Sequence, residues 1–209
     1  MDGEGNRTSQ TIGGVTTSFT LNDDDELTAT SGGFTNSYSY NANGEQTGRT
    51  LSGTAYTLEY DYEGQLTQIT QGQNTTDFVY DALGRRCSRT AGGTTTVFYY
   101  AGDAILLEKQ GSSFTGVYTY GNALLRRNSE YPLYDGHGSE RTVPSSNQTV
   151  TGSINYEAFG QTAGASGSSD SPYMYAGAWG YRTDGDAERR AAAREPSTQI
   201  TSGGEMRLW

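Results

Sequence analysis

The sequence predicts an all-β protein in which antiparallel two-strand repeats lie side by side in one open, curved, continuous sheet. Three features indicate this fold class. A motif of an aromatic residue, Asp or Asn, and Gly returns roughly every twenty residues. Large side chains alternate with small ones before each copy, and a second polar-alternating run follows it. A fixed period of this kind is typical of repeat architectures, and the alternation is typical of a strand with one packed face.

The clearest copy of the motif is Tyr80-Asp81-Ala82-Leu83-Gly84, and further copies lie on both sides of it. Tyr100 and Tyr120 keep the step, although the Asp and the Gly are lost after them. The spacing is looser beyond residue 125. The other full or degenerate copies are Met1 to Gly5, Leu21 to Asp25, Tyr40 to Gly44, Tyr60 to Gly64, Tyr134 to Gly138 and Tyr156 to Gly160.

The clear copies place Asp or Asn three residues before Gly, which is the preference of a type I turn. The Asp side chain can accept hydrogen bonds from nearby backbone N–H groups, and Gly can take the positive φ that ends the turn. The residues before each turn alternate in size, which predicts a strand. The alternating large residues are Phe19 and Leu21, Tyr38 and Tyr40, Leu58 and Tyr60, Phe78 and Tyr80, Phe98 and Tyr100, Tyr118 and Tyr120, and Ile154 and Tyr156.

A second alternating run, such as residues 65–70, predicts the return strand, and a Gly/Thr-rich reversal follows it at residues 71–74 and 91–94. One repeat is therefore expected to be a strand, a tight turn, a strand and a looser turn, with strands of roughly six or seven residues. A single hairpin cannot bury its aromatic face. We therefore expect the copies to stack edge to edge and to align their tyrosines in a ladder.

The motif and its period resemble the YD-repeat, or RHS-repeat, family over roughly residues 1 to 185. The resemblance rests on the step of about twenty, on Tyr-Asp-x-x-Gly, and on the continuation Gly64-Gln65-Leu66-Thr67. Residues 154–185 resemble the more constrained RHS-associated core. The residues that carry this second likeness are Tyr156-Glu157-Ala158-Phe159-Gly160 and Tyr173-Met174-Tyr175-Ala176-Gly177.

The resemblance implies a β-strip that spirals into a hollow shell. In bacterial members such shells enclose a C-terminal toxin polypeptide, and in animal relatives a similar barrel is part of a cell-surface adhesion protein. The implied role is structural and non-enzymatic, and the implied partners are a toxin polypeptide or the remaining repeats of a longer parent chain. The residues expected to carry the structural repeat are Tyr40, Asn41, Gly44, Tyr60, Asp61, Gly64, Tyr80, Asp81, Gly84, Tyr156, Glu157 and Gly160.

The chain departs from the family pattern at its C-terminal part. Family cores continue with Asp-Pro motifs that close the shell and, in some members, carry a self-cleavage aspartate, whereas no Asp-Pro pair occurs here. The resemblance therefore does not extend to self-cleavage. We expect a fragment or degraded copy whose repeats, about seven, leave the sheet open, with exposed edges prone to self-association.

The period divides the chain into three parts. Residues 1–125 are the regular repeats, and residues 126–185 are the core-like segment with irregular loops, including a polar loop at residues 145–148. Within the second part, the aromatic run from Pro172 to Tyr181 is expected to be best packed. Residues 186–209 are a divergent tail, expected to be a marginal helix or disordered.

The amino-acid composition disfavours several classes of structure and function. Hydrophobic residues make up 33% of the chain, below the ~45–50% of typical globular proteins, but 16 tyrosines argue against disorder. A net charge of −10 disfavours binding to nucleic acids and to anionic membranes. The single cysteine excludes an intramolecular disulfide and a Cys-rich zinc site.

The sequence shows no targeting signal of its own. It has no apolar run near the ~20 residues of a membrane span and no signal peptide. Membrane insertion is therefore not expected. A cofactor is not expected either. We expect a secreted or cell-surface location only as part of a parent protein that supplies the export route.

Two clusters of chemically active residues are candidate sites. Asp135, His137 and Ser139 are a triad-like group, but they lie along one tight turn, which rarely places a base between a nucleophile and an orienting acid. The acidic run Asp23 to Glu26 could hold calcium but lacks the spacing of a calcium loop. We expect a turn residue at His137 and solvated charges in the acidic run.

Cys87 has three arginines nearby that could lower the pKa of its thiol. Alternation along a regular strand would place Arg85 and Arg89 on the face of Cys87, and Arg86 on the opposite face. We expect a structural or neutral cysteine.

The tyrosine ladder is the feature that could bind a ligand. Aromatic rings on a sheet can stack on sugar rings or on a chain held inside a shell, and they can equally pack repeat against repeat. The preferred hypothesis is a shell segment, and the alternative is a cell-surface adhesion or carbohydrate-binding repeat protein. A hydrolase is disfavoured by the lone histidine. The Asn-x-Thr triplets at Asn6, Asn74 and Asn147 are expected from chance in a Thr-rich chain.

Overall fold

The fold is described from a computed structural model at residues 1–157, 160, 162–169, 171–179, 181–182, 199–200 and 206–207. These residues belong to two compact units, residues 1–77 and residues 78–209. Each unit is described by itself below.

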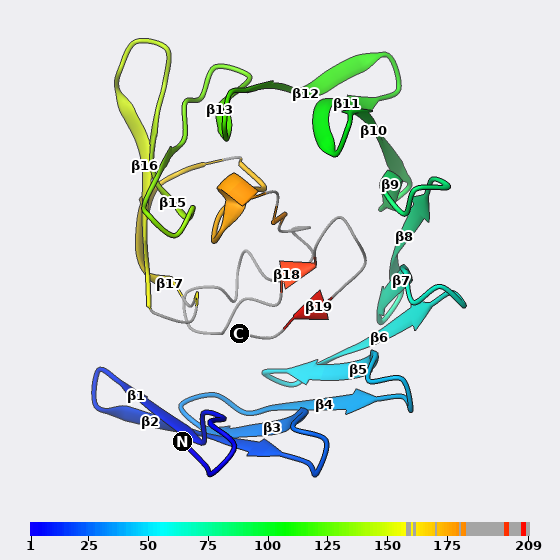
Figure 1. The fold of residues 1–209 in the computed structure, drawn as a ribbon, viewed down its shortest axis with the longest axis vertical. Coiled ribbons are helices and arrows are strands. Elements are labelled where there is room, and N and C mark those ends of the chain that lie inside the picture. Colours follow the sequence, from blue (N-terminus) through cyan, green and yellow to red (C-terminus); the bar gives the residue numbers. More distant parts are fainter. Residues whose placement is uncertain are drawn as a thin grey trace. The chain divides into compact units, whose positions relative to one another are not determined.

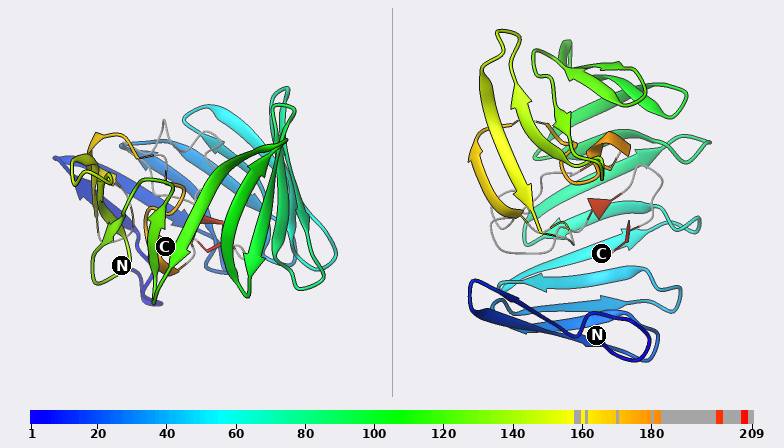
Figure 2. Two further views of the ribbon diagram at one scale, coloured as in Figure 1. Left: turned by 90° about the horizontal axis from the view of Figure 1, so that it is seen from above. Right: turned by 60° about the vertical axis from the view of Figure 1, so that its left-hand side comes forward.

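One sheet of 13 strands accounts for most of the described residues, and its spatial order is the order of the sequence (Figure 1). Neighbouring strands are joined by short hairpin loops (Figure 2). The strands are β1 (Ser9–Ile12), β2 (Val15–Leu21), β3 (Leu27–Gly32), β4 (Asn36–Tyr40), β5 (Gln46–Leu51), β6 (Thr54–Tyr60), β7 (Leu66–Gln71), β8 (Asn74–Tyr80), β9 (Arg86–Ala91), β10 (Thr94–Ala101), β11 (Ala104–Gln110), β12 (Ser113–Tyr120) and β13 (Leu124–Arg127).

A second sheet of four strands follows in the second unit, and the change of sheet falls between β13 and β14. The predicted boundaries at residues 125 and 185 stay predictions. The remaining elements are β14 (Leu133–Tyr134), β15 (Glu140–Pro144), β16 (Val150–Tyr156), β17 (Thr162–Gly167), the 3-10 helix η1 (Gly177–Trp179), and the pair β18 (Gln199–Ile200) and β19 (Met206–Arg207).

The predicted fold class is confirmed. Within the described residues, the long sheet is antiparallel and runs in sequence order, and β1 and β13 stand at the two ends of that order. Short connections between consecutive strands require this up-and-down order, because a parallel pair needs a crossover of a dozen or more residues.

The turn of each repeat is built by one side chain. In the turn between β6 and β7, the Gly64 N–H donates to the Asp61 carbonyl at 3.1 Å, which closes the expected type I turn. The Asp61 carboxylate accepts the backbone N–H groups of Glu63 and Gln65 at 3.0 and 2.9 Å. Gly64 then leaves the turn at a φ of +77°.

The same turn recurs where the sequence is degenerate. Asn22 accepts two backbone N–H groups through its side chain, although Asp25, at φ 61°, stands in the place of Gly. The predicted polar loop at residues 145–148 is another copy. Its Gln148 N–H donates to the Ser145 carbonyl at 2.9 Å, and Gln148 takes a φ of 65°.

The second reversal of each repeat was predicted to be the looser one, and this is wrong. Gln71 pairs directly with Asn74, so only Gly72 and Gln73 form the loop, whereas five residues separate β6 from β7. Gly72 takes a φ of +59° at the first loop position. A two-residue loop with positive φ at this position matches the right-handed twist of the flanking strands, which is why a Gly-rich reversal gives the tighter turn.

A β-bulge after each Asp turn changes which residues share a face. Tyr60 pairs with Leu66, but Glu59 pairs with Gln68, so Thr67 is an extra residue in β7. Leu66 and Ile69, three positions apart, are therefore both buried.

The prediction that Arg86 and Arg89 lie on opposite faces of their strand is wrong, because it assumed a regular strand without a bulge. Arg86 is buried with its guanidinium 4.2 Å from the centre of the Phe78 ring, and Arg89 pairs across the strands with the buried Thr96. Both arginines therefore face the packed side. Cys87 stands one repeat after Thr67, so a strict period of two fails at this position.

The packed face carries two rows of large residues. The row two positions before the motif is buried, and the aromatic residue of the motif itself is half-buried. Tyr40 donates its hydroxyl to the Leu27 carbonyl at 2.9 Å, and Tyr100 donates to the Arg86 carbonyl at 2.8 Å. The buried row is Phe19, Tyr38 and Leu58 in the first unit, and Phe78, Phe98, Tyr118 and Ile154 in the second.

No helix in the described part of the chain has the length and apolar character needed to cross a membrane.

Gly84→Val tests the turn. Gly84 has a φ of +75°, and a β-branched residue held there costs about 2 kcal/mol. We expect a thermal melt followed by circular dichroism to shift down by several degrees, with lower solubility. The control is Ala82→Val in the same turn, at a position without positive φ, which should leave the melt in place. An unchanged melt in Gly84→Val contradicts the turn assignment.

Gln148→Gly and Ser146→Gly test the degenerate turn at residues 145–149. Gln148 has a φ of 65°, so Gly should relieve strain and raise the free energy of unfolding by about 1 kcal/mol. Ser146 lies in the same loop without positive φ, so Gly there should lower it by about 0.5 kcal/mol through chain entropy. Urea unfolding measures both, and equal signs in the two variants would rule out the assignment.

Candidate functional site

The triad-like group at residues 135–139 makes hydrogen bonds that stabilise backbone, mainly that of its own turn. The Asp135 carboxylate accepts the backbone N–H groups of His137 and Ser139 at 2.9 and 3.0 Å. The Ser139 hydroxyl is buried and accepts the Ala176 N–H at 3.0 Å, while His137 is exposed, with its ring 6.4 Å from that of Tyr175. This arrangement stabilises backbone rather than a nucleophile.

The acidic run lies in the degenerate turn after β2. Asp25 accepts the Asn6 side-chain amide at 2.7 Å, and Glu26 accepts that of Asn22 at 2.7 Å. In the described residues, no group of three or more His, Cys, Asp or Glu side chains is placed to hold a metal ion. Cys87 is half-buried.

The residues predicted to carry the repeat lie in the turns or at the strand ends beside them. Tyr40, Tyr60, Tyr80 and Tyr156 are half-buried at the ends of β4, β6, β8 and β16. Gly44, Gly64, Gly84 and Gly160 have φ values of +79°, +77°, +75° and +84°. Glu157 accepts the Gly160 N–H at 3.0 Å through its carbonyl. Residues 186–198, part of the tail that is expected to be a marginal helix or disordered, lie outside the described residues, as do Ala158 and Phe159 of the core motif.

One part of the second unit, residues 171–179 and 181–182, contacts both sheets and is called the docking segment. Its backbone runs against residues 137–140. The Glu140 N–H donates to the Met174 carbonyl at 2.8 Å, and the Ala178 N–H donates to the Gly138 carbonyl at 2.9 Å. The docking segment therefore extends the hydrogen bonding of the second sheet.

The other side of the docking segment reaches the last strands of the long sheet. Tyr173, 3% exposed, belongs to one core cluster with four residues of β10–β13, and its ring meets that of Tyr118 edge-on at 5.7 Å. This buried aromatic agrees with the expectation of good packing from Pro172 to Tyr181, but Trp179 is 67% exposed and does not. The four cluster partners are Phe98, Ile105, Tyr118 and Leu124.

A buried ion pair joins the same two parts. Arg182 pairs with Glu108, which also accepts the Tyr118 hydroxyl at 2.5 Å. Burial by itself would raise the pKa of Glu108, but the charge of Arg182 and these hydrogen bonds outweigh it and hold the pKa below its usual value. Glu108 is therefore a carboxylate. Breaking this pair would leave an uncompensated buried charge.

Glu140 is a second buried carboxyl with the opposite behaviour. It is fully buried at the start of β15 and accepts the Ser169 hydroxyl at 3.0 Å. Burial raises its pKa to about 7 and the charge of Glu130 adds to this, while hydrogen bonds from serine hydroxyls and the charge of Arg127 oppose it. Burial and the charge of Glu140 likewise raise the pKa of Tyr134.

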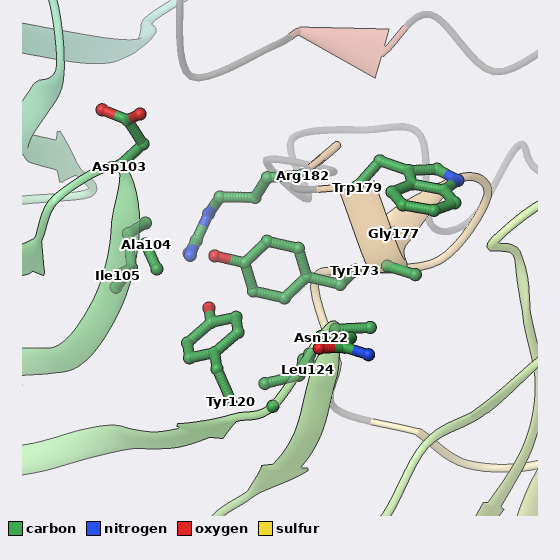
Figure 3. Close-up of a pocket in the computed structure, with 13 residues that line it drawn as sticks. Asp103, Ala104, Ile105, Tyr120, Asn122, Leu124, Tyr173, Gly177, Trp179 and Arg182 are labelled. Atoms are coloured by element: carbon green, nitrogen blue, oxygen red, sulfur yellow. The ribbon is translucent and has the colours of Figure 1, made fainter.

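A cavity of about 370 Å³ opens beside Tyr173 and Arg182 (Figure 3). Three stretches far apart in the sequence line it: residues 103–105, residues 120–124, and a third that contributes Tyr173, Gly177, Ala178, Trp179 and Arg182. The sequence carried no signal for this cavity, for Glu108 or for Glu140, because none of them repeats with the motif.

Glu140→Gln tests the buried carboxyl. The pKa is raised in the folded chain from about 4.5 to about 7, so the proton on Glu140 stabilises the folded state. That contribution is complete below about pH 4.5 and is lost as the pH rises through about 7. We expect Glu140 to lower the free energy of unfolding by on the order of 3 kcal/mol between pH 4.5 and 8.

Urea titrations across this range measure the effect. Glu140→Gln should flatten the pH dependence and stabilise the chain above pH 7, because Gln stays neutral. Glu4→Gln, at an exposed position, is the control and should keep the wild-type slope. If Glu140→Gln keeps that slope too, the buried carboxyl is not its source.

Comparison with known proteins agrees with this architecture. The family model for the Teneurin YD-shell matches residues 1–184. No curated protein matches the chain significantly. The crystal structure of TcdB2-TccC3 superposes with a TM-score of 0.54 at 15% identity, over 92% of this chain and 12% of that chain. The crystal structure of TcdB2-TccC3-Cdc42 gives 0.48 at 12% identity, over 91% and 14%.

At such identity these structures show the fold alone, and this chain spans about an eighth of the first one's length. The family match is independent of them. It covers the regular repeats, the second sheet and the docking segment. The resemblance seen in the motif is thereby confirmed, and the chain belongs to the Teneurin YD-shell family.

Proposed function

We propose that the chain is a non-enzymatic wall segment of a YD shell that encloses a polypeptide, with a C-terminal toxin polypeptide as the cargo class. The single observation that carries this proposal is the unbroken order of the 13-stranded sheet, in which every repeat places its large residues on the same face. A sheet of this kind grows by adding identical units, and it separates two spaces without needing an active site.

The distribution of charge supports a wall. Residues 1–77 contain 11 of the 24 acidic residues and only 2 of the 14 basic ones. Arg7 and Arg49, the two basic residues, lie over the rings of Phe19 and Tyr56 on the packed face. Most of the acids lie in the Asp turns, so the unit's negative charge lies mainly at one end of its strands, where water can solvate it. These acids are Asp2, Glu4, Asp23, Asp24, Asp25, Glu26, Glu45, Asp61 and Glu63.

The first strand suggests how the wall continues. The outward backbone groups of β1 are the kind of edge that pairs with further strands, whereas Arg127 at the end of β13 already pairs through its backbone with Glu130. We propose that the remaining repeats of a longer parent chain occupy the β1 edge, and that the parent is secreted or displayed on the cell surface. The acidic charge disfavours a nucleic-acid partner.

Protease protection tests this function. The full reading frame that contains this segment is expressed, and the purified protein is digested with a nonspecific protease under native conditions. We expect the polypeptide that follows the shell to survive while the shell is folded and to be digested after denaturation. Gly84→Val should reduce protection, and Ala82→Val should not. A frame without further repeats, or a following polypeptide digested at the same rate in both states, argues against the proposal.

The alternative of a cell-surface adhesion or carbohydrate-binding repeat protein stays a prediction from the sequence.

A further inference from the structure

The middle of the docking segment, residues 174–179, is a strap that lies along residues 137–140. Its residues are half-buried or exposed, apart from the buried Gly177. Its attachment to residues 137–140 is therefore mainly polar, through hydrogen bonds that each use a backbone group on at least one side. The pairs are the Glu140 N–H with the Met174 carbonyl at 2.8 Å, the Ala176 N–H with the Ser139 hydroxyl at 3.0 Å, the Ala178 N–H with the Gly138 carbonyl at 2.9 Å, and the Trp179 indole N–H with the His137 carbonyl at 2.9 Å.

Two firmer attachments flank the strap. Tyr173, directly before it, is buried in the aromatic core, and Arg182, shortly after it, forms the buried ion pair with Glu108. Burial of an aromatic ring and of a paired charge makes both contacts costly to break. The strap can therefore separate from residues 137–140 in a local opening while its two flanks hold the docking segment in place.

Glu140 lies where the strap meets the second sheet, and it is fully buried. Its Oε1 accepts the Ser169 hydroxyl, but its Oε2 has no hydrogen-bond partner among the described residues. The hydroxyls of Tyr134, which pairs with Glu140 across the strands, and of Tyr156 are also buried without a partner in that part of the chain. Burial raises the pKa of both phenols, so they stay neutral. A carboxylate enclosed in this way is poorly compensated, and a proton removes the cost of burying its charge.

The other charged groups around Glu140 leave this preference for the neutral form in place. Burial is the largest influence on the pKa of Glu140, and the charge of Glu130 acts in the same direction. The charge of Arg127 and the serine hydroxyls act against burial but do not outweigh it. On β15 itself, Arg141 is paired with Asp135 at 3.5 Å. The strap carries no charged side chain.

We propose that the proton on Glu140 is a switch for the strap, which stays on residues 137–140 while Glu140 is neutral and opens when Glu140 ionises. Opening breaks the hydrogen bonds to residues 137–140 and gives the carboxylate access to water. Tyr173 and Arg182 keep their contacts, so the opening is local and reversible.

The pKa of Glu140 is about 7 while the strap is docked, against about 4.5 once the carboxyl meets water. The proton therefore stabilises docking fully below about pH 4.5, and this contribution is lost as the pH rises through about 7. We expect the opening equilibrium constant of the strap to increase on the order of fiftyfold between about pH 5 and about pH 8. The pKa of Glu108 is held low by Arg182, so that attachment does not change over this range.

Hydrogen exchange at single backbone amides, measured by NMR on the full chain and corrected for the intrinsic effect of pH, tests the proposal. The reporting amides are those of Glu140, Ala176 and Ala178, whose N–H groups join the strap to residues 137–140. Amides of β10 and β11 are the comparison. Exchange through local opening is nearly independent of low urea concentrations, whereas exchange through global unfolding accelerates steeply with urea. We expect the reporting amides to be less protected than the comparison amides, insensitive to low urea, and about fiftyfold less protected at about pH 8 than at about pH 5.

Variants assign this pH dependence to one side chain. Glu140→Gln keeps a neutral side chain of similar size and should remove the pH dependence at the reporting amides. Glu4→Gln, at an exposed position, should keep it. Histidine also titrates in this range, and the ring of His137, the only histidine, lies 6.4 Å from that of Tyr175 in the strap. His137→Gln is therefore a second control and should also keep the wild-type behaviour.

Three results would overturn the proposal: reporting amides with the protection and urea dependence of β10 and β11, a pH dependence that survives Glu140→Gln, or one that disappears in His137→Gln. The first and third results do not require Glu140→Gln to fold. The strap involves no cargo, and none of these results bears on protease protection by the shell, so the two proposals fail independently.

Discussion

The fold depends on a side chain that satisfies the backbone of its own turn. In each repeat with Asp or Asn at the turn start, one side-chain oxygen accepts two backbone N–H groups, and the fourth residue takes a positive φ. This interaction is local, so it forms without help from the rest of the chain. It sets the point at which each strand reverses, and the repeated reversal sets the register of the sheet. Asp25 and Gln148 show that the interaction tolerates loss of the Gly, at the expense of strain.

The bulge beside that turn decides the chemistry of the packed face. By adding Thr67 to β7 against β6, it brings positions three apart onto one face. In β7 these positions hold Leu66 and Ile69, but Gln46 and Arg49 occupy them one repeat earlier, and Arg86 and Arg89 occupy them one repeat later. The face therefore carries guanidinium groups on aromatic rings, and it is less apolar than the core of an ordinary sandwich.

The docking segment gives the second unit a different character. Its contacts are long-range and polar: Arg182 meets Glu108 across 74 positions, and the Met174 carbonyl accepts the backbone N–H of Glu140. One buried carboxyl is held ionised by its arginine, and the other is pushed toward the neutral form by burial. The raised pKa of Glu140 links the stability of this unit to pH. The indole of Trp179 is held separately, by its hydrogen bond to the His137 carbonyl.

The sequence by itself determined the all-β class, the antiparallel order, the Asp turn and the buried row from Phe19 to Ile154. All of these follow from hydrogen bonding and burial within about twenty residues, which spacing encodes directly. Only the tertiary structure decided which residues face the packed side after each bulge and which of the two turns in a repeat is the tighter one. It also decided that Asp103, Asn122 and Trp179 line one cavity. Those outcomes depend on where the chain travels between residues with no shared period. A pattern of spacing cannot encode a contact between segments that do not repeat.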